Sequence, residues 1–343
     1  MKPGTSMRMS DFSDISVVVQ GPVQSFQDRE QESGITQKCL ESVRQHLPGS
    51  TLILSTWPGQ ELAGLDYDRL VISEDPGSNV RFFGRDGAPH RFNNNRQIVS
   101  TREGLREATT KYAVKLRSDN YLTGNNFVAL QREYPKRTST HCFLKERVVV
   151  SNVFTRQYAK GFRVPFHLSD FFYFGLTEDL RTLWDLDLFE DAQDPIHDNE
   201  GALYKSYPPD CTQMFWIKAL QKFDTSIHVN ELLDRSASRL EQSDLCFANN
   251  LVIASPADLG LGLCQKFLGT ARISRPKGQC AQWQHWEWQE IYRRYCDPDF
   301  PKAPASVKAN LFLKRLVHVH PVKLETIVKL HKNRRSSESG GIK

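Results

Sequence analysis

Two stretches of sequence, ISVVVQGPV at residues 15–23 and YAVKLRSDN at residues 112–120, decide the fold. Each begins with an apolar run that is short for a helix and rich in β-branched or aromatic residues. Such runs are typical of buried strands in a parallel sheet. Gly21-Pro22 closes the first run, and Arg117-Ser118-Asp119-Asn120 follows the second. The sequence therefore predicts two strands whose carboxyl ends lead directly into loops.

Strands and helices alternate between these two stretches. Residues 51–55 and 69–73 are predicted strands, whereas residues 36–47 and 93–108 are predicted amphipathic helices, the first with Thr36 as its N-cap. This alternation predicts an α/β fold with a mostly parallel sheet flanked by helices. Ligands of such sheets bind beyond the carboxyl ends of the strands. The polar residues at those ends are Gln20-Gly21, Ser55-Thr56, Glu74-Asp75 and Ser118-Asp119.

The second half of the chain is less regular. Strands are predicted at residues 148–153 and 171–175, and helices at residues 180–188, 210–222 and 281–295. The last of these helices is rich in aromatic residues, among them Trp283, Trp286 and Trp288. These side chains either belong to the core or contact a sugar ring or a lipid interface.

Positive charge is concentrated near the C-terminus. The 343-residue chain has a net charge of +5, but residues 302–335 alone contain nine Lys or Arg and one acidic residue, a net charge of +8. A nucleic-acid-binding protein more often spreads its charge over a whole reading face, so we expect no nucleic-acid partner. The basic amphipathic segment 301–335, which Pro321 divides, is expected to contact an anionic membrane surface, with a solvated or docked helix as the alternative. Residues 336–343 are predicted to be a disordered tail.

Composition and cysteine usage indicate a globular protein of a reducing compartment. The chain is 39% apolar and 25% charged, and no stretch approaches the roughly 20 apolar residues of a membrane-spanning helix. The N-terminus is polar and lacks the apolar region of a cleaved signal. Seven dispersed cysteines without a CxxC pair indicate reduced thiols. We therefore predict a cytoplasmic protein, peripheral at the inner face of the cytoplasmic membrane if segment 301–335 binds there.

Several common catalytic motifs are absent from the sequence. It contains no GxxxxGK[ST] phosphate loop, no complete GxGxxG fingerprint and no GxSxG turn, which argues against P-loop, dinucleotide-dependent and serine-hydrolase chemistry. The remaining candidate functional residue is Asp119, which comes directly after a buried strand. A carboxylate there either joins substrate phosphate oxygens in holding Mg²⁺ or Mn²⁺, or caps a turn.

Taken together, several blocks of the sequence resemble a known family. The blocks are ISVVVQGPV (15–23), TQKCLESVRQHLPGSTLILSTW (36–57), SEDPG (73–77), NNNRQIVSTREGLREATTKYAVKLRSDN (93–120) and HLSDFFYFG (167–175). They resemble the WavE lipopolysaccharide-synthesis family of bacterial glycosyltransferases, within the wider GT-A architecture. The resemblance implies a GT-A-like, Rossmann-type domain at residues 12–300, with a nucleotide-sugar-binding half (12–120), an acceptor half (121–300) and a helical C-terminal extension. GT-A enzymes usually carry a DxD motif, of which Arg117-Ser118-Asp119 keeps only the last carboxylate.

The resemblance also implies roles for individual residues. Asp119 would bind the divalent metal, Mn²⁺ or Mg²⁺, which neutralises the leaving diphosphate. Arg96 would face the diphosphate, with a surface helix charge as the alternative. Asp170 is the first candidate for the general base that activates the acceptor hydroxyl, with a structural hydrogen-bonding role as the alternative and Glu200 and Asp210 as further candidates. The nucleotide base and ribose would contact Gln20, Gly21, Pro22, Ser55, Thr56 and Asp75.

These inferences predict a glycosyltransferase that moves a sugar from a nucleotide-sugar donor to a lipopolysaccharide core, an O-antigen or a related lipid-linked glycan. A nucleotidyltransferase on the same sheet would instead release pyrophosphate. A catalytically inactive carbohydrate-binding or scaffold protein is the second alternative, because the motif at residues 117–119 retains a single acid.

Overall fold

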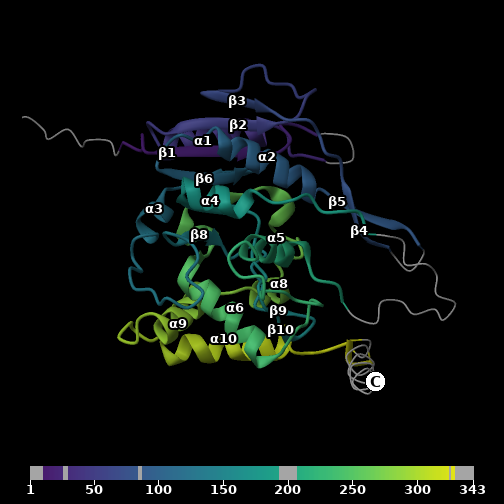
Figure 1. Ribbon diagram of the computed structural model, residues 1–343, viewed down its shortest axis with the longest axis vertical. Coiled ribbons are helices and arrows are strands. Elements are labelled where there is room, and N and C mark those ends of the chain that lie inside the picture. The colour runs from purple at the N-terminus through teal and green to yellow at the C-terminus, as the bar shows by residue number, and fades with distance from the viewer. Residues whose placement is uncertain (1–10, 26–29, 84–86, 193–206, 324–325, 329–343) are drawn as a thin grey trace, which may run out of the picture.

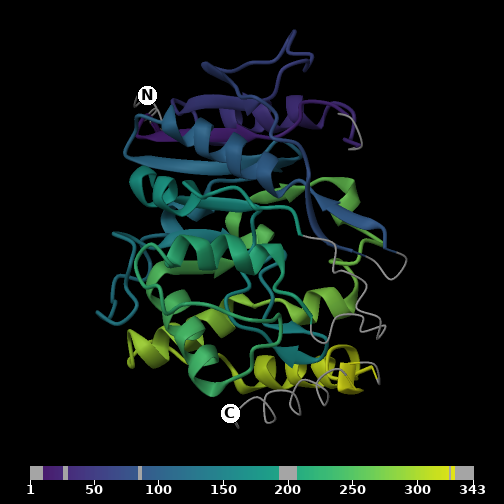
Figure 2. The same cartoon turned by 45° about the vertical axis from the view of Figure 1, so that its right-hand side comes forward.

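A seven-stranded sheet runs through the centre of the molecule (Figures 1 and 2). The computed structural model describes residues 11–25, 30–83, 87–192, 207–323 and 326–328. From one edge of the sheet to the other, the strands are β12 (Leu251–Ala254), β8 (Val148–Ser151), β11 (Phe172–Leu176), β6 (Tyr112–Arg117), β1 (Ile15–Gln20), β2 (Thr51–Thr56) and β3 (Arg69–Ile72).

Six of the seven strands run in one direction, and β11 runs against them. β1 pairs in parallel with both β2 and β6, so that Val18 lies opposite Ile53 and Lys115. β11 is antiparallel to its neighbours β6 and β8, while β8 and β12 are parallel. This arrangement confirms the predicted α/β fold with a mostly parallel sheet. Because β11 is reversed, the residues just before it lie at the same edge of the sheet as the carboxyl end of β6.

Helices flank this sheet, and short pairs of strands lie outside it (Figure 1). The helices are α1 (Ile35–His46), α2 (Asn94–Arg106), α3 (Asn126–Leu130), α4 (Thr177–Trp184), α5 (Cys211–Leu220), α6 (Ala237–Asn250), α7 (Pro256–Leu259), η1 (Gln265–Phe267), α8 (Pro276–Ala281), α9 (His285–Tyr295) and α10 (Ala305–His318). The additional strand pairs are β4 (Asn79–Phe83) with β5 (Pro89–Phe92), β7 (Asn120–Leu122) with β13 (Leu261–Leu263), and β9 (Tyr158–Ala159) with β10 (Phe162–Arg163).

One hydrophobic core serves both halves of the chain. Every residue of β1 is buried, as expected for a strand whose two faces are both covered. The core that begins at Ile15 extends through the sheet to Tyr292 of α9. Trp283 and Trp288 are buried within it, and Trp288 packs edge-on against Tyr134. The core alternative therefore holds for these two tryptophans, whereas Trp286 is half-buried.

Two local expectations from the sequence are wrong. Thr36 is not the N-cap of α1; that position belongs to Gly34, which adopts a left-handed backbone. The Thr36 hydroxyl instead donates to the carbonyl oxygen of Ser118, 3.2 Å away. Ser118 lies in the buried turn after β6, and its carbonyl oxygen is the acceptor that draws this hydroxyl away from the helix start. The helix predicted over residues 281–295 begins only at His285, as α9, because the backbone of Gln282 is extended after α8.

The C-terminal helix α10 lies along the lower margin of the molecule (Figure 1). Arg315 anchors it, because its buried guanidinium pairs with Glu287 and donates to the carbonyl oxygen of Cys280. Lys308 pairs with Glu290 at 2.8 Å. α10 ends at His318, before Pro321, as the break predicted there requires. No helix within the described residues is long and apolar enough to cross a membrane. The predicted tail at residues 336–343 lies outside the described part of the chain.

Candidate active site

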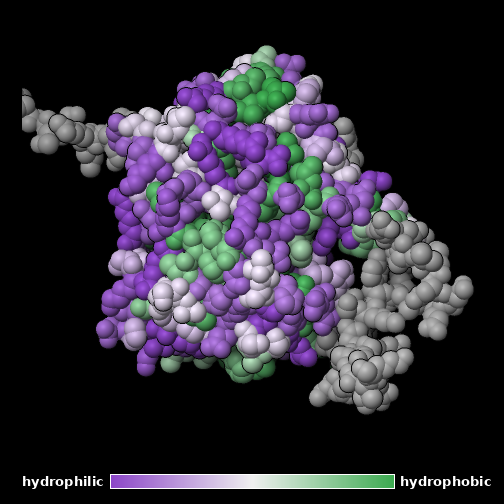
Figure 3. Space-filling view, viewed as in Figure 1, coloured by the Kyte–Doolittle hydropathy of each residue, from purple (hydrophilic) through white to green (hydrophobic). Residues whose placement is uncertain are grey.

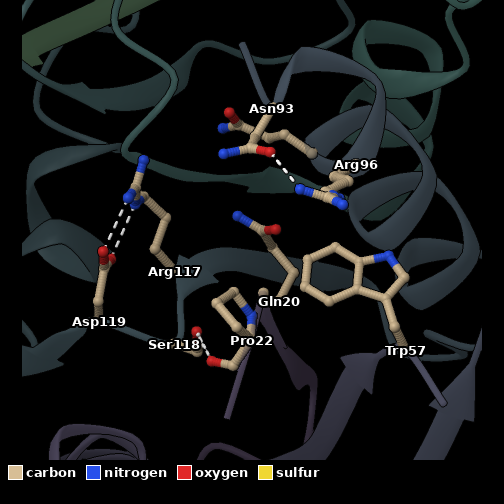
Figure 4. A pocket seen from close by; sticks show the side chains of 10 residues that line it. Gln20, Pro22, Trp57, Asn93, Arg96, Arg117, Ser118 and Asp119 are labelled. Carbon is tan, nitrogen blue, oxygen red and sulfur yellow. Dashed lines mark hydrogen bonds and ion pairs between the residues drawn. The ribbon is translucent and has the colours of Figure 1, made fainter. Parts of the chain in front are cut away.

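A cavity opens at the carboxyl edge of β1 and β6, where the sequence predicts a ligand (Figure 4). Its walls come from the loops after these two strands, the residue after β2 and the N-terminal turn of α2. The lining residues are Gln20, Gly21, Pro22, Trp57, Asn93, Arg96, Gln97, Arg117, Ser118 and Asp119. Gln20, Gly21, Pro22, Arg96 and Asp119 are thus brought together as the resemblance implies.

The floor of the cavity is a close junction between the loops after β1 and β6. The Ser118 amide donates to the Gln20 carbonyl oxygen at 2.9 Å, and the Ser118 hydroxyl donates to the Pro22 carbonyl oxygen at 2.7 Å. Gly21 has a φ of +128°, and a Cβ on it would lie 2.7 Å from Ser118 Oγ. Both the backbone conformation and the lack of space therefore require glycine at this position.

The N-terminal turn of α2 forms the wall opposite this floor. Arg96 is buried and donates from Nε and Nη2 to the two carboxylate oxygens of Asp75, at 2.8 and 2.9 Å. Its Nη1 donates to Asn93 Oδ1 at 2.6 Å. Asn93 is the N-cap residue, yet its side chain makes no capping hydrogen bond. The first amides of any α-helix lack partners within the helix, and here the Asn93 side chain does not supply one, so this helix start favours anions.

Asp119 shares its carboxylate between two cations. Arg117 Nε and Nη2 donate to its two oxygens at 2.8 and 2.7 Å, and Lys266 Nζ, from η1, contacts Oδ2. The Asp119 side chain is only 3% exposed. Although burial alone would raise its pKa, the charges and hydrogen bonds of Arg117 and Lys266 hold the pKa of Asp119 well below its usual range. The carboxylate is therefore ionised at any physiological pH.

Two aromatic rings hold the guanidinium of Arg117 in place. Its central carbon lies 4.7 Å from the centre of the Phe171 ring and 5.7 Å from that of Phe267. The two rings meet edge-on, with their centres 4.7 Å apart. Contacts of a guanidinium with ring faces are favourable and fix its orientation. Phe171 precedes β11 and Phe267 belongs to η1, so segments distant in sequence complete the site.

The donor set around Asp119 does not fit a divalent cation. Mg²⁺ and Mn²⁺ require several oxygen ligands, usually with negative charge. Here both carboxylate oxygens are ion-paired, and within the described ranges no group of three or more His, Cys, Asp or Glu side chains comes together. A metal at Asp119 stays a prediction from the resemblance that the residues present do not favour.

Asp170 lies beside this cluster, directly before the reversed strand β11. Its carboxylate Oδ2 is 3.9 Å from Arg117 Nη1. Its backbone carbonyl oxygen accepts hydrogen bonds from Gln97 Nε2, at 3.0 Å, and from Lys115 Nζ. Lys115 is completely enclosed in β6, and burial lowers its pKa to about 7. The backbone of Asp170 is thus held by two side chains, and its carboxylate lies near Arg117, although Asp170 is not one of the residues that line the cavity.

Asp210 has a structural setting of its own. It is the N-cap of α5, its Oδ2 lies 3.5 Å from His167 Nε2, and Arg156 Nη1 is 3.7 Å away. Burial lowers the pKa of His167, so its imidazole is neutral near pH 7. This carboxylate is accordingly committed to capping and to its neighbours. Glu200, the other further candidate, lies outside the described residues.

Ser55, Thr56 and Asp75 do not line the cavity. Ser55 and Thr56 are fully buried in β2, and the Ser55 hydroxyl donates to the Ser100 carbonyl oxygen in α2 at 2.7 Å. Asp75 contacts the cavity only indirectly, because its carboxylate holds the guanidinium of Arg96. The sequence reasoning did not assign Trp57, Asn93 and Lys266. Trp57 ends one of the matching sequence blocks and Asn93 begins another, which could have marked them, but Lys266 carries no local signal.

The sheet order, the reversed strand and the cavity at the carboxyl edge define a GT-A-like α/β protein with an anion-favouring site. Residues 15–321 match the family described as WavE lipopolysaccharide synthesis. This match covers most of the chain, and the protein belongs to that family, which is involved in lipopolysaccharide synthesis. A search of curated proteins finds no match.

Proposed function

We propose that this protein is a glycosyltransferase that moves a sugar from a nucleotide-sugar donor to a lipopolysaccharide core, an O-antigen or a related lipid-linked glycan. One observation carries the proposal: the Asp170 carboxylate lies 3.9 Å from Nη1 of Arg117, and Arg117 lines a cavity together with Arg96 and the start of α2. A base is thus next to groups that suit a diphosphate. Membership of a lipopolysaccharide-synthesis family supports the acceptor class.

The donor would lie along the carboxyl edge of the sheet. Gln20, Gly21 and Pro22, together with Trp57, offer a surface for the base and ribose, and Ser55 and Thr56 support it from beneath. Ser100 holds the Gln20 side chain in place, since its hydroxyl donates to Gln20 Oε1 at 2.7 Å. The diphosphate would then reach Arg96 and Arg117, which line the same cavity.

In this reaction the acceptor hydroxyl oxygen attacks the anomeric carbon of the sugar. The bond from that carbon to the phosphate oxygen breaks, and its electron pair leaves on the nucleoside diphosphate. The hydroxyl proton passes to the carboxylate of Asp170. This is a direct displacement with inversion, in which the base must touch the acceptor. Arg117 Nη1, 3.9 Å from the Asp170 carboxylate, lies beside this proton acceptor.

The replacement Asp170→Asn tests this assignment. It should lower kcat by about 10²-fold or more and leave the KM for the donor nearly unchanged, because the base acts on the acceptor. Asp187→Asn, at an exposed carboxylate, is the matched control. Normal turnover by a folded Asp170→Asn protein would exclude Asp170 as the base and leave Glu200 and Asp210, the other two carboxylates predicted from the sequence. Release of pyrophosphate rather than nucleoside diphosphate would identify a nucleotidyltransferase.

We also propose that α10 rests on an anionic membrane surface. Four apolar side chains are exposed on it: Phe312, Leu313, Leu316 and Val317. Val317 is the most exposed of the four, at 67%. Figure 3 shows apolar atoms at the lower margin, along which α10 runs in Figure 1. Lys302, Lys314 and Lys323 are exposed nearby. Arg315 and Lys308 are paired within the protein, so fewer charges are available than the sequence suggests.

A further inference from the structure

Lys266 occupies an unusual position in the site. It belongs to η1, 147 residues after Asp119 in the chain, yet its ammonium contacts the Asp119 carboxylate directly. Arg117 already binds that carboxylate through two hydrogen bonds. The Asp119 carboxylate is thus paired with two cations, and Arg117 also lies 3.9 Å from the Asp170 carboxylate. Because Arg117 alone already binds both oxygens of Asp119, Lys266 is not needed to satisfy them.

The two cations differ in mobility. Arg117 is 12% exposed and packs against Phe171 and Phe267. Among the described residues its Nη1 makes no hydrogen bond, and the Asp170 carboxylate lies 3.9 Å from it. Lys266 is 39% exposed, at the end of a flexible four-carbon side chain. Arg117 therefore offers fixed donors toward the cavity, while Lys266 can turn from Asp119 toward an incoming anion without any change in the fold.

We propose that Arg117 and Lys266 bind the diphosphate of the nucleotide donor in place of a divalent cation. This inference rests on the proposed transferase function and names the groups that hold its leaving group. Lys266 lies on Asp119 where a metal ion would have to bind. When the diphosphate enters, the ammonium moves to a phosphate oxygen, and Asp119 stays paired with Arg117. The bond that breaks in the reaction then leaves its electron pair on an oxygen that this cation neutralises.

Electrostatics also disfavour a metal in this place. A divalent cation on Asp119 would lie against the guanidinium of Arg117 and would have to displace Lys266, and like charges this close repel strongly in a buried site. A phosphate group meets the opposite situation, because its oxygens accept hydrogen bonds from Arg117 Nη1, from the ammonium and from the first amides of α2.

Binding of inorganic pyrophosphate tests the inference directly. Calorimetric titration of the full chain in EDTA should detect binding without added metal. Lys266→Met should weaken that binding at least about tenfold, and Lys266→Arg should restore most of it, since either cation pairs with phosphate. Lys277→Met, at an exposed lysine of α8, should bind like the wild type. Asp119→Asn should bind pyrophosphate in EDTA as tightly as the wild type or more tightly, because it releases Lys266.

Several results would overturn the inference. They are the absence of pyrophosphate binding in EDTA, binding that requires Mn²⁺, and unchanged affinity of a folded Lys266→Met protein. A sugar-transfer assay separates this outcome from the function itself. If EDTA abolishes sugar transfer, the protein is a transferase but does not bind the diphosphate without metal. If pyrophosphate binding depends on Lys266 but no nucleotide-sugar supports transfer, the anion site is real and the proposed transferase function is wrong.

Discussion

Asp75 and Arg96, 21 residues apart in the chain, are joined by two parallel hydrogen bonds of 2.8 and 2.9 Å. Asp75 follows β3, and its own carboxylate accepts from the Gly77 amide at 2.9 Å. Although burial alone would raise it, the hydrogen bonds from Arg96 and Gly77 hold the pKa of Asp75 below its usual value. The loop after β3 thereby sets the direction of the arginine at the start of α2, although Asp75 itself does not line the cavity.

The first prediction concerns this pair. Asp75→Asn should raise the KM for the nucleotide-sugar donor about tenfold and change kcat less, because the guanidinium loses its charged acceptor and its fixed orientation. The control is Asp66→Asn, since Asp66 binds Arg44 through the same two guanidinium atoms at an exposed position. Steady-state kinetics on the two folded variants is the measurement. Equal KM values for both variants would contradict a positioning role for Asp75.

A second prediction follows from the burial of Lys115. Its pKa is about 7 in the folded protein and is ordinarily 10.5, so the unfolded chain binds more protons between these values. Stability contributed by this group therefore rises as pH increases from about 7 to about 10.5. Lys115→Met should remove that rise. Urea unfolding at pH 7 and pH 9.5 measures it, and Lys111→Met, at an exposed lysine just before β6, is the control.

The same variant also reports on Asp170. Lys115 donates to the Asp170 carbonyl oxygen, so its removal should loosen the candidate base as well as change the pH dependence. We expect kcat to fall while the donor KM stays within about threefold, because the cavity lining is untouched. If the stability of a Lys115→Met protein depended on pH as that of the wild type does, the pKa of Lys115 would not be lowered in the folded protein.

A third prediction tests the junction beneath the cavity. Gly21→Ala should destabilise the protein by ~1–3 kcal/mol, since the new Cβ would meet Ser118 Oγ and alanine rarely adopts this backbone conformation. Donor binding should weaken as well, because the loops after β1 and β6 would separate. Gly124→Ala is the control, because its Cβ would make only ordinary contacts at 3.5 Å. Thermal unfolding and donor titration of both variants decide the question, and equal stability would contradict the close packing.

The fourth prediction concerns α10. The double variant Leu313→Glu/Val317→Glu should reduce sedimentation with anionic vesicles at least about tenfold, since it places two charges at the proposed membrane contact. Binding by the wild type should weaken as salt rises, because exposed lysines contribute to it. Ile72→Glu, an exposed apolar residue of β3 at the opposite end of the molecule, is the control (Figure 1).

Substitutions are preferable here to removal of the C-terminal segment. Truncation after Pro301 would delete Arg315 and leave the buried carboxylate of Glu287 without its partner. Loss of one member of a buried ion pair commonly lowers the free energy of unfolding by ~3–5 kcal/mol. A truncated protein could therefore lose vesicle binding because it unfolds rather than because it lacks the membrane contact. Unchanged vesicle binding by a folded Leu313→Glu/Val317→Glu protein would refute the membrane contact.

Much of the first half of the fold follows from local sequence patterns. The strands expected at residues 15–19, 51–55 and 112–116 agree with β1, β2 and β6 to within one residue. Their apolar runs are long enough, and their turn residues clear enough, to fix both ends. The reversed direction of β11 could not be predicted in this way, because the run Phe172–Leu176 has the same pattern in either orientation.

The candidate site likewise contains residues that could be predicted from local sequence patterns and residues that could not. Gln20, Gly21 and Asp119 could be predicted because they follow strands that are recognisable from the sequence. The partners of Asp119 could not, since an ion pair across 147 residues depends on how η1 packs against the sheet. Ser55 points toward α2 rather than into the cavity, and this depends on which face of the strand the helix covers.

The long separation between Asp119 and Lys266 also bears on the evolution of the family. Arg117 and Lys266 share the Asp119 carboxylate, so a lineage that loses the lysine leaves position 119 with less compensating charge. An acid at position 117 would remove the competing guanidinium. We expect these columns to vary as a set, with arginine at 117 accompanying lysine at 266, and an acid at 117 accompanying a neutral residue there. Sorting homologues by this pattern would separate sequences with a paired acid at position 119 from sequences that leave this acid available to a metal ion.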